Sequence, residues 1–437
     1  MQALLVLSIS LMAGLMLSRV AKIFNLPAVT AYLVAGVLIG PFVLGQLGVA
    51  GLGFVSLDDV ESYSIIKDVA LGFIAFAIGN EFRLSQLKKI GKQATIIGIF
   101  QAVVTTLLVD AFLIGLHFIL GEEVFPLSAA IVLGAIASAT APAATLMVVK
   151  QYKATGPVTD ILLPVVALDD AVGLVLFAVS FGIAKALAVS AGAINIAAII
   201  LEPIIEVVGS ILLGLVMGIL FNFFERFFHS RSKRLAMSIC FVFLTVAISK
   251  IDDMHIGDIH IAFSPLLACM MLGTVFCNIC EFSEELMGRV DRWSGPVLII
   301  FFVLSGAELN LLVLAVPTVL IIGVVYLISR SLGKYFGAYG SAKLTNCDDN
   351  IVKYLGITLL PQAGVALGMA DLAKKFFVGE YVYIAEIIMS ITLFAVLVYE
   401  LVGPMLTKMA LTKAGDIQPE GRTSARDAAM AEMAEKK

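Results

Sequence analysis

Charged side chains are what this sequence has least of. Asp, Glu, Lys and Arg make up 14% of its 437 residues, whereas soluble domains carry about 25%. Apolar residues make up 60%, and the mean hydropathy is +1.03. This composition excludes an ordinary soluble domain and predicts an all-α membrane protein that crosses the bilayer many times.

Other signals are missing too. No cluster of Lys and Arg indicates a nucleic-acid partner, and the net charge is −4. The five cysteines include one CxxC spacing, between Cys277 and Cys280, without a second such pair, which favours packing over a metal or redox site. Residues 1–20 lack the basic segment and the cleavage site of a secretory signal, so we expect a retained first helix.

Long apolar runs fill most of the chain. A helix needs about 20 apolar residues to cross a bilayer. We therefore expect a transmembrane domain over residues 1–407 and a short cytoplasmic tail over 408–437. The apolar runs predict about thirteen transmembrane helices, at 3–22, 28–45, 62–82, 93–119, 125–149, 157–185, 193–224, 234–251, 260–279, 294–311, 313–340, 351–373 and 382–407.

The few basic residues are distributed unevenly between the two ends of these helices. With the N-terminus outside and the C-terminus in the cytoplasm, 22 of the 29 Lys and Arg residues fall at inner ends and loops. This distribution follows the positive-inside rule and favours that orientation. Arg330 and Lys334 are left within the eleventh predicted helix.

The two halves of the chain carry the same short patterns. Residues 79–84 and 306–311 both fit Gly-x-Glu-apolar-x-Leu. A Leu-x-Ala pattern followed by Gly begins at Leu33 and recurs at Leu266, with a similar offset between the two copies. Because the second and ninth helices must cross in opposite directions, these matching offsets predict inverted repeats, an architecture of secondary transporters.

Pro142 and Pro361 are expected to break the fifth and twelfth predicted helices, and their separation is close to the offset of the repeated patterns. Proline lacks a backbone donor and so leaves a carbonyl free. Ser138 and Thr140 precede the first break and Gln362 follows the second proline, which adds polar groups to both. Interrupted backbone is tolerated in a membrane only where it is buried or lines a cavity, so we expect two crossed discontinuous helices. Ordinary proline kinks are the alternative.

Asp169 and Asp170 stand side by side in an apolar run with no basic residue near them in the sequence. An ionised carboxylate in the bilayer core costs about 3 kcal/mol or more, and two adjacent ones also repel each other. The pattern therefore favours an intramembrane site for cations and protons over a buried acidic pair or a helix N-cap. Arg330 and Lys334 share one helical face, and either could supply the counter-charge or reach the inner interface.

Other acidic residues also fall within predicted helices, and four of them carry an expectation. Asp110 and Glu400 are expected to form structural pairs. Glu81 and Glu308 are expected near the inner membrane interface, where a charged side chain is tolerated at low cost.

Together these motifs resemble the monovalent cation:proton antiporter superfamily, in the branch of Kef-type and bacterial sodium/proton exchangers. The resemblance covers about residues 1–407. It implies a bacterial inner-membrane homodimer, with a transport core within 93–185 and 313–407 and dimerisation helices elsewhere. The residues that carry it are 32–41, 79–84, Thr140-Ala141-Pro142, Asp169-Asp170, Gly333-Lys334 and 360–364.

The resemblance also implies residue roles. Asp170 would be the main ion-binding carboxylate, Asp169 its partner, bridged to Lys334 in one protonation state, and Thr140 would lie near the ion. Kef-type potassium systems tend to have Gln at the position of Asp169, so the first Asp favours sodium. A site with two adjacent Asp residues and a Lys resembles the site of the electrogenic members of this superfamily.

The expected activity is exchange of Na⁺, or of K⁺ or Li⁺, for H⁺ by competition at the Asp pair, with alternating access. Membrane lipid and the transported ions are the expected partners, without a cofactor and without enzymatic catalysis. A sodium-coupled symporter of an organic solute and a K⁺/H⁺ efflux antiporter stay open. An aspartyl protease is disfavoured because adjacent helical residues point about 100° apart, and a channel because no filter-like repeat is found.

Overall fold

The computed structural model places most of the chain. Residue Pro142, in the first predicted break, lies outside the described residues. These are 2–23, 28–48, 53–84, 91–141, 145, 148–149, 152–189, 196–251, 255–256, 259–260, 263–309 and 316–417.

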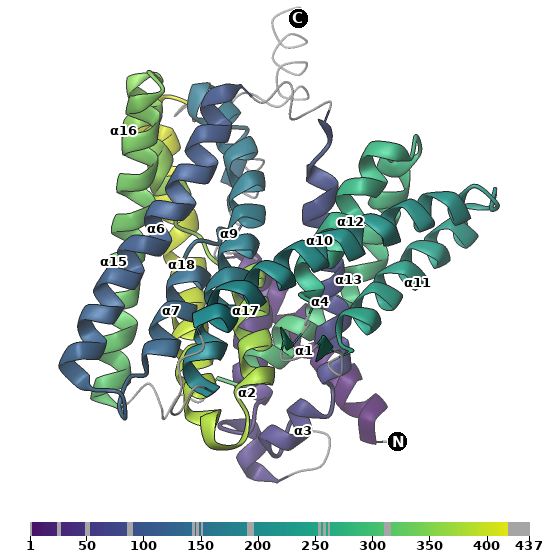
Figure 1. Ribbon diagram of the computed structural model, residues 1–437, viewed down its shortest axis with the longest axis horizontal. Helices are drawn as coiled ribbons and strands as arrows, with labels where there is room; N and C mark the ends of the chain where they lie inside the picture. The colour runs from purple at the N-terminus through teal and green to yellow at the C-terminus, as the bar shows by residue number, and fades with distance from the viewer. Residues whose placement is uncertain are drawn as a thin grey trace, which may run out of the picture.

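The described chain is a succession of helices (Figure 1). Its first half contains α1 (Gln2–Ile23), α2 (Ala28–Ile39), the 3-10 helix η1 (Leu44–Leu47), α3 (Leu57–Glu61), α4 (Ser64–Glu81), α6 (Lys92–Leu120), α7 (Leu127–Ile136), α9 (Pro157–Val189) and α10 (Ile196–Glu225). Its second half contains α11 (Arg231–Ser249), α12 (Pro265–Ile279), α13 (Ser283–Ala307), α15 (Pro317–Leu344), α16 (Asp349–Thr358), α17 (Gly364–Phe376), the 3-10 helix η2 (Gly379–Tyr381) and α18 (Val382–Ala414). One short antiparallel hairpin, β1 (His255–Ile256) with β2 (Ile259–His260), joins α11 to α12.

The predicted helical membrane fold is confirmed. Within the described ranges, nine helices are long and apolar enough to cross a membrane, and α7 and α12 are shorter apolar helices. Every one of the thirteen predicted segments contains a described helix, but the number of crossings stays a prediction. Two boundaries differ clearly from the prediction: α13 begins at Ser283, and α18 continues to Ala414.

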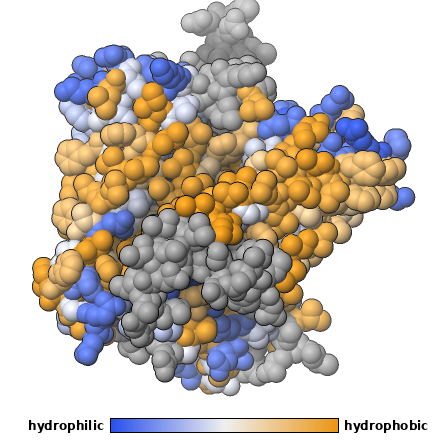
Figure 2. Space-filling view, viewed as in Figure 1, coloured by the Kyte–Doolittle hydropathy of each residue, from blue (hydrophilic) through white to orange (hydrophobic). Residues whose placement is uncertain are grey.

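The outer surface of the molecule is apolar around its middle. Figure 2 shows hydrophilic residues gathered at the two ends and an apolar belt between them. Large apolar side chains such as Leu107, Phe118, Phe223 and Phe336 are exposed. A soluble protein rarely leaves an apolar belt of this extent in water. The chain is therefore an integral membrane protein.

The helices lie in two groups side by side, as Figure 1 shows. The site bundle consists of α6, α7, α9 and α15 to α18, and the flanking bundle consists of α1, α2, α4 and α10 to α13. The site bundle is made of the ranges expected for a transport core. The division into core and dimerisation roles stays a prediction.

Two glycines allow helices of the flanking bundle to pack backbone against backbone. A Cβ at Gly306 of α13 would lie 2.1 Å from the carbonyl oxygen of Leu33 in α2. A Cβ at Gly79 of α4 would lie 1.9 Å from the carbonyl oxygen of Met270 in α12. Both glycines come from the repeated Gly-x-Glu pattern, so each half of the chain uses that pattern for the same kind of contact. This observation supports the inverted repeat, which stays a prediction.

Candidate functional site

Two helices of the site bundle are interrupted, and their interruptions touch. Helix α7 ends at Ile136 and the backbone through Ala141 is not helical. Helix α16 ends at Thr358, and α17 begins only at Gly364. The backbone N–H of Ala141 donates to the carbonyl oxygen of Pro361 at 2.8 Å. These two segments, 137–141 and 359–363, are the crossing.

Arg330 of α15 satisfies carbonyls that the interruptions leave free. Its guanidinium donates to the carbonyl oxygens of Ala137 at 2.9 Å, Ala139 at 2.7 Å and Leu360 at 2.7 Å. Its side chain is fully buried and lies 4.4 Å from the ring centre of Tyr399. Because the planar guanidinium has donors on three nitrogens, it can bind several carbonyls at once. Arg330 therefore joins the two interrupted segments, and it forms no ion pair with an Asp among the described residues.

Two more residues predicted for the breaks have local roles. The Gln362 Nε2 donates to the carbonyl oxygen of Ile136 at 3.0 Å and lies 3.1 Å from the Tyr326 hydroxyl. The Ser138 hydroxyl donates to the carbonyl oxygen of Ala135 at 2.7 Å. Ser138 faces α9 at Gly173, where a Cβ would lie only 2.8 Å from the Ser138 Oγ. The glycine thus lets α9 approach the crossing.

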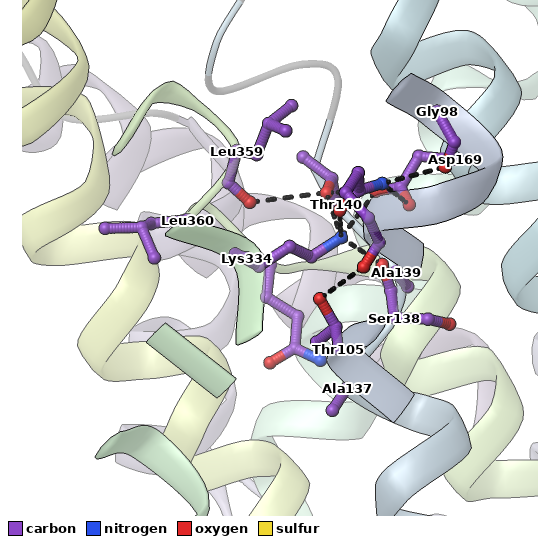
Figure 3. Close-up of polar contacts among 12 residues, drawn as sticks. Gly98, Thr105, Ala137, Ser138, Ala139, Thr140, Asp169, Lys334, Leu359 and Leu360 are labelled. Atoms are coloured by element: carbon purple, nitrogen blue, oxygen red, sulfur yellow. Dashed lines mark hydrogen bonds and ion pairs between the residues drawn. The ribbon is translucent and has the colours of Figure 1, made fainter. Parts of the chain in front are cut away.

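Asp169 of α9 is the centre of a buried polar cluster beside the crossing (Figure 3). Its Oδ2 lies 2.7 Å from the Nζ of Lys334 in α15, and both side chains are fully buried. The Thr140 hydroxyl and the Gln101 amide of α6 also donate to the Asp169 carboxylate. The structure therefore brings together three of the predicted residues, from the crossing, α9 and α15.

Lys334 is surrounded by oxygen atoms from several elements. Besides Asp169, its Nζ contacts Thr140 Oγ1 at 2.9 Å, Gln101 Oε1 at 3.1 Å and the carbonyl oxygen of Ser138. A site that surrounds an ammonium ion with carboxylate, hydroxyl, amide and carbonyl oxygens has the ligand types that hard cations such as Na⁺ also require.

Asp170 follows on the next position of α9 and is 1% exposed. Successive helical residues point about 100° apart, so Asp170 presents its carboxylate on a different side of α9 from Asp169. Its charge also acts on Lys334. Two carboxylates are therefore buried next to a single ammonium group.

Sequence reasoning missed Gln101 and the role of Arg330. Gln101 is fully buried in α6, in an otherwise apolar stretch. A single amide in an apolar helix is a usable signal, because buried polar groups must find partners. The acceptors of Arg330 are backbone carbonyls, which leave no mark in the sequence.

The pairing expected for Asp110 and Glu400 is wrong. Neither carboxylate has a basic partner among the described residues, and one oxygen of each lacks a hydrogen bond there. The one hydrogen bond that Glu400 accepts from a described side chain comes from the Thr30 hydroxyl, at 3.5 Å. Asp110 lies against Gly134, where a Cβ would be 1.7 Å from its Oδ1.

A second cluster of buried charges lies where α4 begins. The Nζ of Lys67 is 2.9 Å from Glu308 Oε1 at the end of α13 and also pairs with Asp371 of α17. Lys374 reaches the same Glu308 oxygen at 2.9 Å, and Lys375 reaches Asp371 at 2.9 Å. These pairs join the flanking bundle to one half of an interrupted helix.

This second cluster corrects the expected position of Glu308. Lys67 is in the first turn of α4, whereas Glu81 is its last residue. Glu308 therefore lies at the opposite end of the molecule from Glu81, and the two cannot both be at the inner interface. The prediction was wrong because α4 and α13 correspond to the third and tenth helices, which cross in opposite directions.

Comparison with known proteins identifies the family. A model of the family described as "Sodium/hydrogen exchanger, transmembrane" matches residues 7–413. The chain belongs to this family. The sodium/hydrogen exchangers are transporters and not enzymes, as expected from the sequence.

Relatives of this exchanger have been described in two organisms. The chain is 26% identical over 404 residues to the high-affinity Na⁺/H⁺ antiporter NhaS3 of Synechocystis, with 82% of each chain covered. It is 22% identical over 376 residues to the probable Na⁺/H⁺ antiporter 3 of Methanocaldococcus jannaschii, covering 85% of this chain and 88% of that protein. The exchanger also shares the fold of the sodium proton antiporter MjNhaP1 of M. jannaschii, whose structure was determined at pH 8. The TM-score is 0.72 and the sequence identity 18%, and the match covers 95% of this chain and 99% of MjNhaP1.

Proposed function

We propose that this exchanger transports Na⁺ against H⁺ by competition at Asp170 and Asp169. Membership of the sodium/hydrogen exchanger family supports the proposal, as do the two relatives described as Na⁺/H⁺ antiporters. The observation that carries it is the buried Asp169–Lys334 pair at the crossing, with Asp170 as its neighbour on α9.

In the proposed mechanism, Lys334 occupies the Asp169 carboxylate while no sodium is bound. A sodium ion that enters binds Asp170 and competes with Lys334 for Asp169, and the Thr140 hydroxyl supplies a further oxygen. Protons compete with the same ion because each carboxylate binds either a proton or a cation. One site then exchanges the two ions without a second substrate path.

Access to the site would alternate by movement of the site bundle against the flanking bundle, as in other transporters with interrupted helices. We further propose a homodimer formed through the flanking bundle, with the N-terminus outside and the C-terminus in the cytoplasm. Residues 408–414 belong to the end of α18, which Gly415 caps, so a cytoplasmic tail would begin after them.

The test is transport by the purified protein in liposomes that contain a pH-sensitive dye. Addition of Na⁺ should move protons in the opposite direction, and Asp170→Asn should abolish the movement. Asp160→Asn is the matched control, because Asp160 lies on the same helix and is exposed; it should transport normally. Normal exchange in Asp170→Asn would overturn the proposed site.

The same liposomes separate the alternatives. K⁺ or Li⁺ in place of Na⁺ gives the cation selectivity, and clamping the membrane potential tells an electrogenic from an electroneutral exchange. Absence of proton movement with every cation, together with sodium-dependent uptake of an organic anion, would favour a symporter.

A further inference from the structure

Glu400 is a buried carboxylate between the two bundles that belongs to neither of the charged clusters described above. Glu400 lies within α18 of the site bundle and is 1% exposed. Its Oε2 is 3.5 Å from the hydroxyl of Thr30, which belongs to α2 of the flanking bundle and is also buried. Its Oε1 has no hydrogen-bond partner among the described residues. The carboxyl group therefore bridges the contact between the bundles with one weak hydrogen bond.

This contact lies beside the crossing. Pro361 packs against Gly403, one turn along α18 from Glu400, where a Cβ would be 2.8 Å from the Pro361 Cγ. Val29, the neighbour of Thr30, packs against Ala141 and Ala363 of the interrupted segments. Pro404 has no N–H to donate to the carbonyl of Glu400 four residues earlier, so this carbonyl lacks its usual helical donor.

The buried charged groups on α15, α17 and α9 next to α18 have other partners. On α15, Arg330 binds three carbonyls and Lys334 pairs with Asp169. On α17, Asp371, Lys374 and Lys375 belong to the cluster with Lys67, and on α16, Lys353 pairs with Asp349. The Asp169 and Asp170 carboxylates of α9 lie in the Lys334 cluster. Helices α2 and α7 carry no charged side chain, and the phenols on the neighbouring elements include Tyr32 on α2, Tyr326 on α15 and Tyr399, which precedes Glu400 in the chain.

The burial of Glu400 and the lack of a cationic partner in the described part of the chain favour its neutral form. An isolated ionised carboxylate in a low-dielectric interior costs so much that such groups take up a proton instead. No cationic side chain in the described part of the protein pairs with Glu400 to offset that cost. A protonated carboxyl needs only the modest hydrogen bonding that Thr30 offers.

We propose that Glu400 is a second proton-binding site of the exchanger, which carries a proton while α18 is packed against α2 and releases it when this contact opens. On release the O–H bond of the carboxyl breaks, and the proton passes to water at the membrane face that becomes accessible. The carboxylate must take up a proton again before the contact re-forms. The inference rests on the proposed movement of the bundles and adds a proton-linked group outside the Asp169 cluster.

Infrared difference spectroscopy of the purified protein tests the proton directly. The C=O stretching band of protonated carboxyls should contain a component in the wild type that is missing in Glu400→Gln, while a component from Asp110, which also lacks a basic partner among the described residues, stays. The Glu400 component should remain in Asp170→Asn and in Glu386→Gln, a control on the exposed face of α18. Thr30→Val should shift this component without removing it, because only the hydrogen bond is lost. An identical band in Glu400→Gln and wild type, or no such band in wild type, would overturn the proposal.

The transport assay tests the coupling. Glu400→Gln cannot become charged, so it should keep exchanging at alkaline pH where the wild type slows. A single titrating group changes a rate by up to about tenfold per pH unit. The fall of the exchange rate at alkaline pH should therefore be reduced in Glu400→Gln by up to about that factor per pH unit. A pH profile of Glu400→Gln that coincides with those of wild type and Glu386→Gln would overturn the coupling. If wild type shows no antiport, the proposed function fails, while the infrared band still decides the protonation of Glu400.

Discussion

The Nζ of Lys334 lies 2.7 Å from Oδ2 of Asp169, with both side chains inaccessible to solvent. The two residues are 165 positions apart in the chain and come from α15 and α9. A buried ion pair gives little net stabilisation compared with apolar residues, but loss of one partner leaves an uncompensated charge. The pair is therefore well suited to exchange one cation for another at Asp169.

A double-mutant cycle tests this relationship. Lys334→Met and Asp169→Asn should each lower the free energy of unfolding by about 3–5 kcal/mol, because each leaves one buried charge unpaired. The double variant should recover a large part of the summed loss. Denaturant unfolding in detergent measures all three variants. Lys353→Met, in a pair whose side chains are 59% and 91% exposed, should change stability by less than about 1 kcal/mol. Purely additive losses would contradict the coupling.

Arg330→Lys should be harmful although it keeps the positive charge. The guanidinium bonds three carbonyls from both interrupted segments, and an ammonium group cannot reproduce that planar arrangement. Hydrogen bonds to charged groups contribute about 1.5–3 kcal/mol each, so we expect a loss of about 2 kcal/mol or more, together with slower exchange. The control is Arg289→Lys, whose side chain is 30% exposed in a single ion pair. Equal thermal stability of the two variants would disprove the bridging role.

The fold was predictable because its main signal is local. Each apolar run predicted to cross the bilayer overlaps a described helix, and Pro361 marked an interruption that the structure contains. The beginning of α13 was missed because its first turns carry Glu284, Glu285 and Arg289. Those charged turns continue the helix beyond the apolar run, and hydropathy alone does not detect them.

The site was only partly predictable. The two adjacent Asp residues and Lys334 stand out because ionisable groups are costly in a membrane. The choice between Lys334 and Arg330 depends on a contact across 165 residues, which the sequence does not encode locally. The same is true of Lys67 and Asp371, which are 304 residues apart. Such pairs follow from helix packing, so they could be recognised only in three dimensions.

Gln101 is expected to set the competition between sodium and protons. Its amide donates to Asp169 and accepts from Lys334 at 3.1 Å. In Gln101→Leu the carboxylate is less stabilised and binds a proton more readily, so sodium competes less well. Loss of about 1.5–3 kcal/mol corresponds to a rise of roughly tenfold or more in the KM for Na⁺. Gln93→Leu, on the exposed start of α6, should leave KM unchanged, and an unchanged KM in Gln101→Leu would refute the role.

Burial should decide how much each ion pair at Glu308 contributes to the free energy of unfolding. Lys67 and Lys374 contact the same oxygen at 2.9 Å, but their side chains are 3% and 26% exposed. Lys67→Met should cost about 3–5 kcal/mol, as expected for a buried pair that loses one partner. Lys374→Met should cost less than about 1 kcal/mol, and added salt should reduce that cost further. Unfolding at low and high salt measures both, and equal costs would show that burial does not govern this cluster.

Gly306 allows α2 and α13 to pack backbone against backbone. In Gly306→Ala the new methyl group would lie 2.1 Å from the Leu33 carbonyl oxygen, so the two backbones must separate. Overpacking of this kind costs about 1–3 kcal/mol or more. Gly288→Ala on the same helix meets no atom within 4 Å, and it should be slightly stabilising because alanine favours helix. Thermal unfolding of the two variants in detergent compares them directly. A Gly306→Ala variant as stable as Gly288→Ala would mean that α2 and α13 do not pack as closely as the structure shows.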